Sequence, residues 1–270
     1  MDTASPCPEW DFHVLLLYRD EPHRQDSVAS WVQRGLERGE QIVYTHAPSD
    51  SVLLSNLAER GVDVDMAMRV GQLTLLTTEE FYPAGDHRPL IESALAEGYP
   101  AVRLTARADA ALRFLREEDH LALELLMDGL CATLPVSAMC QYDATGTTSA
   151  RLAAVIERHP DAVDYAGLQL RRRGQVMAVA GEVDHASAPM VTESLRRVCS
   201  LLEEWSVLTI DTSRWSFVDV AGFRAVAAGT DAFRRGGGGV RLSGLRPHMR
   251  KVLTLAGVPR LDGVVLDEGN

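Results

Sequence analysis

The side chains best suited to bind a small molecule flank two predicted strands in the first half of the chain. Residues 12–18 and 136–142 are short, mainly apolar runs of the kind that form buried strands. Ligands of open α/β sheets bind where such strands end, so we expect polar and aromatic side chains there to face a pocket. The candidate ligand-binding residues are His13, Tyr18, Arg19, His23, Cys140 and Tyr142. The alternative is that these histidines and rings serve packing alone.

The same half contains residues that could bind a metal, but it lacks the catalytic motifs considered below. His13, Cys140 and His159 carry nitrogen and sulfur donors suited to zinc or iron, but their spacing does not demand an ion. We therefore predict no metal and no cofactor. The place of a phosphate-binding loop reads RDEPHR (residues 19–24), without its glycines and lysine, which argues against ATP hydrolysis. No G-x-S-x-G elbow occurs, and a cysteine on an interior strand is inert, so we predict no catalytic residues.

A second candidate site is Val207–Val226, which reads strand, turn, helix. Val207–Ile210 is predicted as a buried strand, and residues 211–218 as a turn whose bulky side chains, among them Phe217, pack on the body of the fold. Asp219 stands where a helix N-cap is expected. A helix start exposes backbone N–H groups and a partial positive charge, so it can bind an anion or carry a phosphorylated hydroxyl.

The first 162 residues alternate between predicted strands and helices. This alternation indicates βαβ units and a mainly parallel sheet with helices on both faces. The predicted strands are 12–18, 41–47, 73–77, 101–105 and 136–142, and the predicted helices are 25–38, 49 or 50 to 60, 90–97, 109–115, 121–132 and 149–159.

The remainder of the chain predicts a smaller α/β domain with a mixed sheet. A hairpin over 168–179 leads to a helix opened by Ser187 and Pro189, and the segment Val207–Val226 follows. A strand at 240–243, a helix from Pro247 and a strand at 263–266 complete it.

Composition supports this division into residues 1–162 and 163–270. The chain has 270 residues, and its charge is uneven: 26 acidic and 13 basic side chains in the first part, 12 and 14 in the second. The acidic balance argues against nucleic acid as a partner. No apolar run reaches the roughly 18–20 residues of a membrane span. The first residues lack the basic and apolar parts of a signal peptide, so we expect a cytoplasmic protein.

The second part resembles the STAS domains of bacterial anti-sigma factor antagonists. The family reads strand, then Phe-x-Asp-Ser-Ser-Gly-Leu at a helix start, and residues 217–223 match this pattern. Residues 181–184, 240–244 and 252–258 match three further motifs in the family's order, so the resemblance covers about 163–268. In the family the second serine is phosphorylated by an anti-sigma kinase. Here that position is Ala221, which has no hydroxyl.

The STAS resemblance implies a docking face for an anti-sigma factor of the ATP-binding, kinase-like type. The expected partner-binding residues are Asp184, Arg214, Asp219, Val220, Ala221, Gly222, Phe223 and Arg224. Ser213 and Ser216 precede the motif, so we expect no phosphorylation at this site. The alternative is an ordinary capped helix packed on its sheet.

Residues 11–162 resemble the MEDS domain, a sensory module of bacterial and archaeal regulators related to RecA-like ATPases. The resemblance lies in residues 13–18, 35–41, 71–76, 97–105 and 140–143, together with His159-Pro160. It implies a degenerate RecA-like fold, without a phosphate-binding loop, that perceives a small-molecule signal.

The two resemblances together predict a non-enzymatic regulator that acts by partner switching, binding an anti-sigma factor and so freeing a sigma factor. A homodimer is compatible with this role. Two alternatives stay open: a degenerate ATPase-like protein that binds a nucleotide or small molecule, and a scaffold subunit of a stress-sensing assembly.

Overall fold

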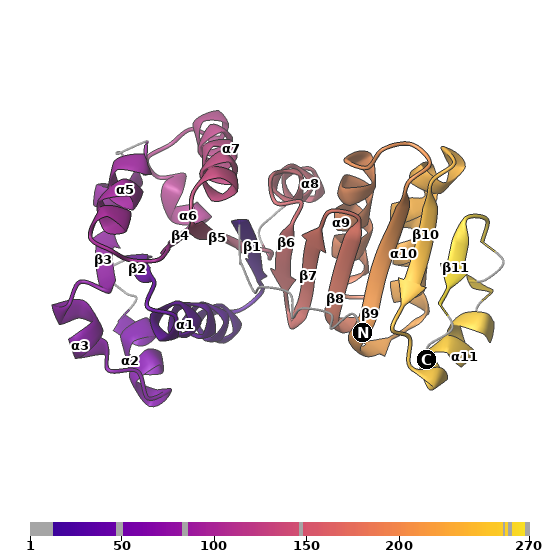
Figure 1. The fold of residues 1–270 in the computed structure, drawn as a ribbon, viewed down its shortest axis with the longest axis horizontal. Coiled ribbons are helices and arrows are strands. Elements are labelled where there is room, and N and C mark those ends of the chain that lie inside the picture. Colours follow the sequence, from indigo (N-terminus) through magenta and orange to yellow (C-terminus); the bar gives the residue numbers. More distant parts are fainter. Residues whose placement is uncertain are drawn as a thin grey trace. The chain divides into compact units, whose positions relative to one another are not determined.

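The computed structural model describes residues 13–46, 51–82, 86–145, 148–255, 257–258 and 261–267. The chain divides into two compact units, residues 1–14 with 25–140, and residues 15–24 with 141–270. The division passes through the first and fifth strands, which Figure 1 labels β1 and β5.

The N-terminal part of the chain forms a largely parallel sheet. Its strands are β1 (His13–Tyr18), β2 (Gln41–His46), β3 (Leu73–Thr77), β4 (Val102–Arg107) and β5 (Val136–Asp143), in the spatial order β1-β5-β4-β2-β3. β2 pairs in parallel with both β3 and β4. All six residues of β1 are buried, as a continuous apolar run in a two-sided sheet requires. The predicted α/β class and the positions of these strands are confirmed.

Helices follow the strands as the alternation predicts. They are α1 (Glu21–Glu37), α2 (Ser51–Glu59), α3 (Val64–Arg69), α4 (Thr78–Phe81), α5 (Arg88–Ala96), α6 (Ala108–Ala111), α7 (Glu117–Thr133) and α8 (Ser149–Arg158). The predicted start of the first helix at residue 25 was wrong, because Asp20 accepts a hydrogen bond from the backbone N–H of His23 and so starts α1 at Glu21. The sequence missed the short α3 and α4. The predicted caps Ser49 and Asp50 lie outside the described residues.

A buried ion pair fixes α1 against β4 in the first unit. Arg103 pairs with Glu40, and both side chains are buried. The guanidinium of Arg103 also lies 4.8 Å from the ring centre of Trp31 and donates to the Trp31 carbonyl at 3.3 Å. A Cβ at Gly35 would come within 2.5 Å of the Arg103 side chain, so only glycine leaves room for this arrangement.

The C-terminal part forms a mixed sheet. Its strands are β6 (Ala162–Tyr165), β7 (Leu168–Arg173), β8 (Val176–Val183), β9 (Val207–Val218), β10 (Gly239–Ser243) and β11 (Val264–Leu266), which lie side by side in chain order. The pairs β6–β7 and β7–β8 are antiparallel, whereas β8–β9, β9–β10 and β10–β11 are parallel. The predicted mixed sheet is confirmed.

Two helices pack together on one face of this sheet (Figure 1). They are α9 (Ala188–Ser200) and α10 (Val220–Arg235); α11 (Pro247–Leu255) follows β10. A Cβ at Gly229 would lie 2.8 Å from Leu195 Cβ and from Thr192 O, so this glycine lets the two helices approach closely.

The strand β9 is longer than the sequence suggested. Asp211 and Thr212 were expected to end it, but β9 continues to Val218. Its register with β8 shifts twice, which changes the side-chain alternation so that Thr212, Trp215 and Val218 all face inward. Phe217 consequently points outward and is 49% exposed, contrary to the expectation that it packs on the body.

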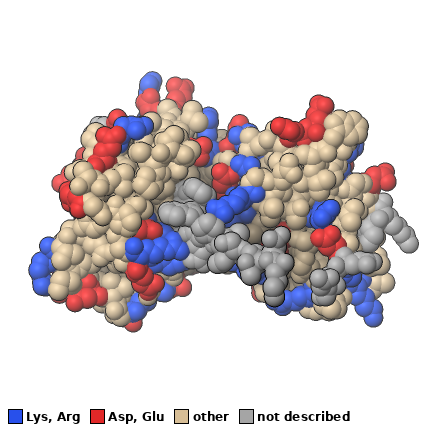
Figure 2. Space-filling model, in the orientation of Figure 1, with Lys and Arg blue, Asp and Glu red and all other residues tan. Residues whose placement is uncertain are grey.

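Acidic and basic side chains are interspersed over the face of each unit that Figure 2 displays. No helix within the described ranges combines the length and the apolar character needed to cross a bilayer.

Candidate functional site

The start of α10 is held by the side chain predicted to cap it. Asp219 Oδ1 accepts a hydrogen bond from Gly222 N at 2.7 Å, and its Oδ2 accepts one from His185 N at 3.1 Å. A Cβ at Gly222 would lie 2.2 Å from the carbonyl oxygen of Val183, so glycine allows the helix start to touch the end of β8. Asp219 and Gly222 therefore build the corner between β8 and α10.

We call the exposed residues that precede and follow Ala221 in the chain, Arg214, Phe217, Val220 and Arg224, the rim; Ala221 is itself partly exposed. Val220 is 54% exposed, and Phe217 lies outside on the preceding strand. Arg214 and Arg224 are exposed as well. Isolated exposed apolar residues are ordinary, but two large ones in a short segment that also carries two exposed arginines are typical of a protein-binding surface.

Besides Asp219, three of the predicted partner-binding residues make their contacts within the domain. Phe223 is 5% exposed and packs against Trp215, with ring centroids 6.3 Å apart, so it supports α10 and does not lie on the rim. Gly222 is buried at the corner. Asp184 accepts hydrogen bonds from the N–H and hydroxyl of Ser187, and these bonds lower the pKa of its carboxyl. Asp184 thus helps to start α9.

The six predicted ligand-binding residues separate into two groups. His13 and Cys140, in the first unit, are in contact: His13 Nε2 lies 3.4 Å from Cys140 Sγ. Tyr18, Arg19, His23 and Tyr142 belong to the second unit. Arg19 is exposed, and Tyr142 packs edge-on against His159, with ring centroids 6.4 Å apart.

Sequence reasoning missed Arg24 in the RDEPHR segment. Its side chain is 1% exposed, donates to Gln141 Oε1 at 2.7 Å and pairs with Glu21. The guanidinium also lies 5.9 Å from the ring centre of Tyr18. A buried arginine held by a glutamate thus stands in the segment that in a phosphate-binding loop would be glycine-rich.

A polar stripe on α7 supplies further residues that the sequence prediction overlooked. His120, Glu124 and Asp128 are spaced four residues apart, which places them on one face of the helix. His120 and Glu124 are buried. This spacing within an otherwise apolar segment was the signal that could have identified them.

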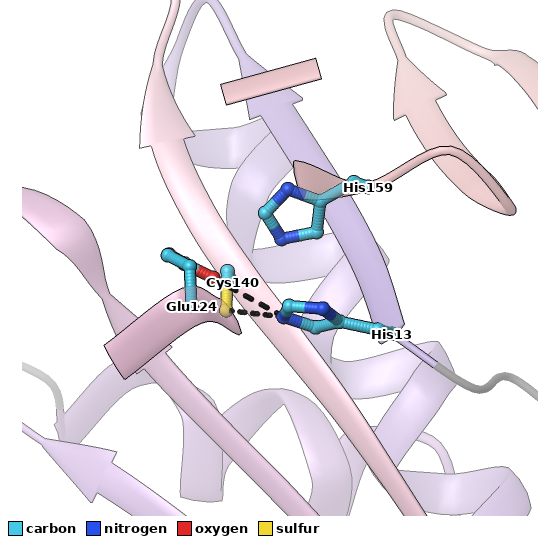
Figure 3. Close-up of side chains that lie close together, drawn as sticks. All are labelled: His13, Glu124, Cys140 and His159. Atoms are coloured by element: carbon cyan, nitrogen blue, oxygen red, sulfur yellow. Dashed lines mark hydrogen bonds and ion pairs between the residues drawn. The ribbon is translucent and has the colours of Figure 1, made fainter. Parts of the chain in front are cut away.

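His13 connects this stripe to β5. Its Nε2 lies 3.1 Å from Glu124 Oε2 as well as 3.4 Å from Cys140 Sγ, and its Nδ1 lies 3.7 Å from Asp128 Oδ1. The other oxygen of Glu124 lies 3.5 Å from His120 Nε2. Three potential metal ligands of the first unit, His13, Glu124 and Cys140, are drawn in Figure 3.

These surroundings alter how the cluster holds protons. Burial disfavours a charged His13, but the hydrogen bonds to Asp128 and Glu124 outweigh it and raise the pKa of His13 above its usual 6.5. Burial first, and Glu124 second, raise the pKa of the Cys140 thiol well above its usual value. Without a bound ion, Cys140 is therefore a neutral thiol.

A pocket of the first unit adjoins the cluster, with an empty volume of about 400 Å³ that includes its part open to solvent. Its walls are mainly apolar, and Glu124 and Cys140 form part of them. Of the six predicted ligand-binding residues, Cys140 is the one that lines this pocket. The other polar side chains of the wall are Tyr82, His87, Thr105 and His120.

Comparison with protein families gives two matches. Residues 12–160 match the MEDS model, described as the methanogen/methylotroph, DcmR sensory domain, and residues 166–266 match a model described as Mlab, STAS domain. No curated protein gives a significant match to the chain.

Two solved structures show a weak similarity to parts of the chain. The anti-sigma factor antagonist SpoIIAA in its unphosphorylated form is 19% identical, with a TM-score of 0.30, and the match covers 38% of this chain and 89% of that one. The flagellar accessory protein FlaH from Methanocaldococcus jannaschii is 7% identical, with a TM-score of 0.41, over 63% of this chain and 77% of that one.

Proposed function

Because the chain belongs to the MEDS family and carries a STAS domain in its C-terminal part, we propose that it couples a sensory domain to an anti-sigma factor. The combination is that of a signalling regulator related to the anti-sigma factor antagonists. In our proposal residues 1–162 perceive a small molecule and residues 163–270 bind an anti-sigma factor of the ATP-binding, kinase-like type. The protein performs no catalysis of its own.

The observation that carries this proposal is the rim around Ala221. Phe217 and Val220 offer apolar area, and Arg214 and Arg224 offer positive charge, at the helix start that corresponds to the STAS motif. A partner with an apolar patch bordered by carboxylates would complement this surface. Asp219, Gly222 and Phe223 act by fixing the shape of the rim.

Control of this contact cannot use a hydroxyl at position 221, since the residue there is alanine. Ser213 and Ser216 lie in β9, before the start of α10, and not in a turn as predicted. We infer that ligand occupancy of the sensory domain sets the activity, which requires the ligand to bind two states of the protein with different affinity. The apolar pocket of the first unit supports such a ligand site.

Binding of the full chain to purified anti-sigma factors of the same genome, measured by biolayer interferometry, tests the proposal. Arg224→Glu should weaken the complex at least about tenfold, roughly 1.4 kcal/mol, because an acidic residue replaces an arginine on the rim. Arg235→Glu makes the same charge change at the other end of α10, where Arg235 pairs with Asp231, and should leave binding unchanged. Equal affinities of the two variants would contradict the assignment of the rim.

Phosphorylation provides a second arm of this experiment. After incubation with the anti-sigma factor and ATP, mass spectrometry should find no phosphate on residues 211–230. Ala221→Ser restores a hydroxyl at the start of α10 and should become phosphorylated if the bound partner is a kinase. Phosphate on residues 211–230 of the wild-type chain would contradict the proposal that no kinase controls this site.

A further inference from the structure

The cluster of His13, Glu124 and Cys140 has the dimensions of a metal site. In tetrahedral zinc sites, Zn–N and Zn–O distances of about 2.0–2.2 Å and Zn–S of about 2.3 Å place nitrogen roughly 3.5 Å from sulfur and roughly 3.4 Å from oxygen. Here the nitrogen of His13 lies 3.4 Å from the sulfur of Cys140 and 3.1 Å from the oxygen of Glu124. All three donor atoms lie within 4.8 Å of one another.

We propose that the first unit, called the first domain from here on, binds a zinc ion through His13 Nε2, a carboxylate oxygen of Glu124 and Cys140 Sγ. The three donors come from three elements, β1, α7 and β5, and converge on one point (Figure 3). Nitrogen, oxygen and thiolate sulfur together suit zinc better than magnesium or calcium, which take oxygen ligands. Zinc binds only an unprotonated Nε2 of His13 and a thiolate of Cys140, so protons held by these two groups pass to solvent as the zinc–nitrogen and zinc–sulfur bonds form.

The residues around the donors match the supporting shell of a metal site. A histidine that binds metal through Nε2 usually directs its Nδ1–H at a carboxylate, which fixes the ring and its tautomer. Asp128 stands on the Nδ1 side of His13, with its oxygen at 3.7 Å. His120 stands on the second oxygen of Glu124, at 3.5 Å. The stripe on α7 therefore supplies both a donor and two residues that orient the donors.

The site also borders the pocket of the same domain. Glu124 and Cys140 line both the proposed ion site and the pocket wall. The two positive charges of a zinc ion held there would be balanced by the Glu124 carboxylate and the Cys140 thiolate at the cavity wall. This inference concerns the first domain alone and does not depend on the binding of an anti-sigma factor by the second.

Metal content of the purified full chain is the first measurement. We expect about one zinc per chain by inductively coupled plasma mass spectrometry. After removal of the zinc, cobalt(II) should restore occupancy and give a thiolate-to-cobalt charge-transfer band in the near ultraviolet. A folded protein that contains no metal and gives no such band with cobalt would overturn the proposal.

Variants then assign the donors. Cys140→Ser should abolish the charge-transfer band, whereas Cys131→Ser, which removes another buried thiol of the same domain, should retain it. Circular dichroism of each variant checks that it is folded. Retention of the band in Cys140→Ser would overturn the assignment of the sulfur donor.

A milder change keeps the test decisive if Cys140→Ser does not fold. Asp128→Asn alters an orienting residue that is partly exposed, so the fold should persist, and zinc affinity should fall about 10–100-fold. Asp119→Asn is the matched control, because Asp119 lies on the same helix and pairs with Arg116 at the surface. Equal zinc affinity in the two variants would contradict the orienting role of Asp128 and the site built on it.

Discussion

The two candidate sites depart from ordinary protein surfaces and interiors in opposite ways. In the first domain, charged and titratable side chains are buried: Arg103 with Glu40, and His13 with Glu124. In the second domain, large apolar side chains are exposed beside the start of α10, namely Phe217 and Val220. Buried charge and exposed apolar area are the two departures that most often signal function.

The difference separates the tasks of the two parts. A buried polar group is costly unless a specific partner binds it. A cluster of such groups therefore suits a small ligand or an ion. An exposed apolar rim is stabilised by being covered, so it favours a macromolecular partner. The contrast therefore supports our proposal that the first domain perceives a ligand and the second contacts a partner.

Removing one member of the buried ion pair should have the largest effect on stability. Arg103→Met leaves Glu40 as a buried, unpaired carboxylate and should lower the free energy of unfolding of the first domain by about 3–5 kcal/mol. The double variant Arg103→Met with Glu40→Leu should recover much of this loss, since no charge stays buried. Urea denaturation measures the stability of both variants. If Arg103→Met were as stable as the wild type, the buried charges would not distinguish the first domain from the second.

Loss of the cap at the α10 corner should have an intermediate effect. Asp219→Ala removes the acceptor for Gly222 N and for His185 N and should cost about 0.5–2 kcal/mol in the second domain. Asp231→Ala, in the exposed last part of the same helix, should stay within about 0.5 kcal/mol of the wild type. Chemical denaturation of both variants measures the difference, and equal losses would show that the corner is not specially held.

The smallest effect concerns pH and His87, a buried residue of the pocket wall. Burial lowers the pKa of His87 below 6.5, although Phe81 and Asp86 partly oppose this. The unfolded chain therefore takes up this proton before the folded one, so stability is full above pH 6.5 and declines as the pH falls below it. His87→Phe, which keeps an aromatic ring against Phe81, should flatten this decline. Thermal melts between pH 7 and about 5 compare the two, and parallel curves would contradict the assignment.

Most strands were predictable because each is a short apolar run between turn residues. The runs at β2, β3 and β4 illustrate this. The length of β9 was not predictable, because its register shifts against β8 hide the alternation of its side chains. The exposure of Phe217 depends on those shifts, so an exposed aromatic of the rim was mistaken for a packed one.

The two sites differed in how far the sequence revealed them. The α10 corner is local: cap, glycine and rim lie within a few residues, and the sequence placed Asp219 correctly. The buried cluster joins residues far apart, since His13 and Cys140 are separated by 127 positions. Glu124 could be found only by noticing that polar residues recur every fourth position on α7.

The two hydrogen bonds of Asp219 bear on how a STAS domain could lose the serine at this position. The carboxylate of Asp219 accepts hydrogen bonds from the backbone at His185 and at Gly222. It therefore holds these two segments together without the side chain at position 221. A serine there could be lost, and a covalent off-signal with it, while the outline recognised by a partner stayed the same. The corner is therefore held by Asp219 and not by the residue at position 221.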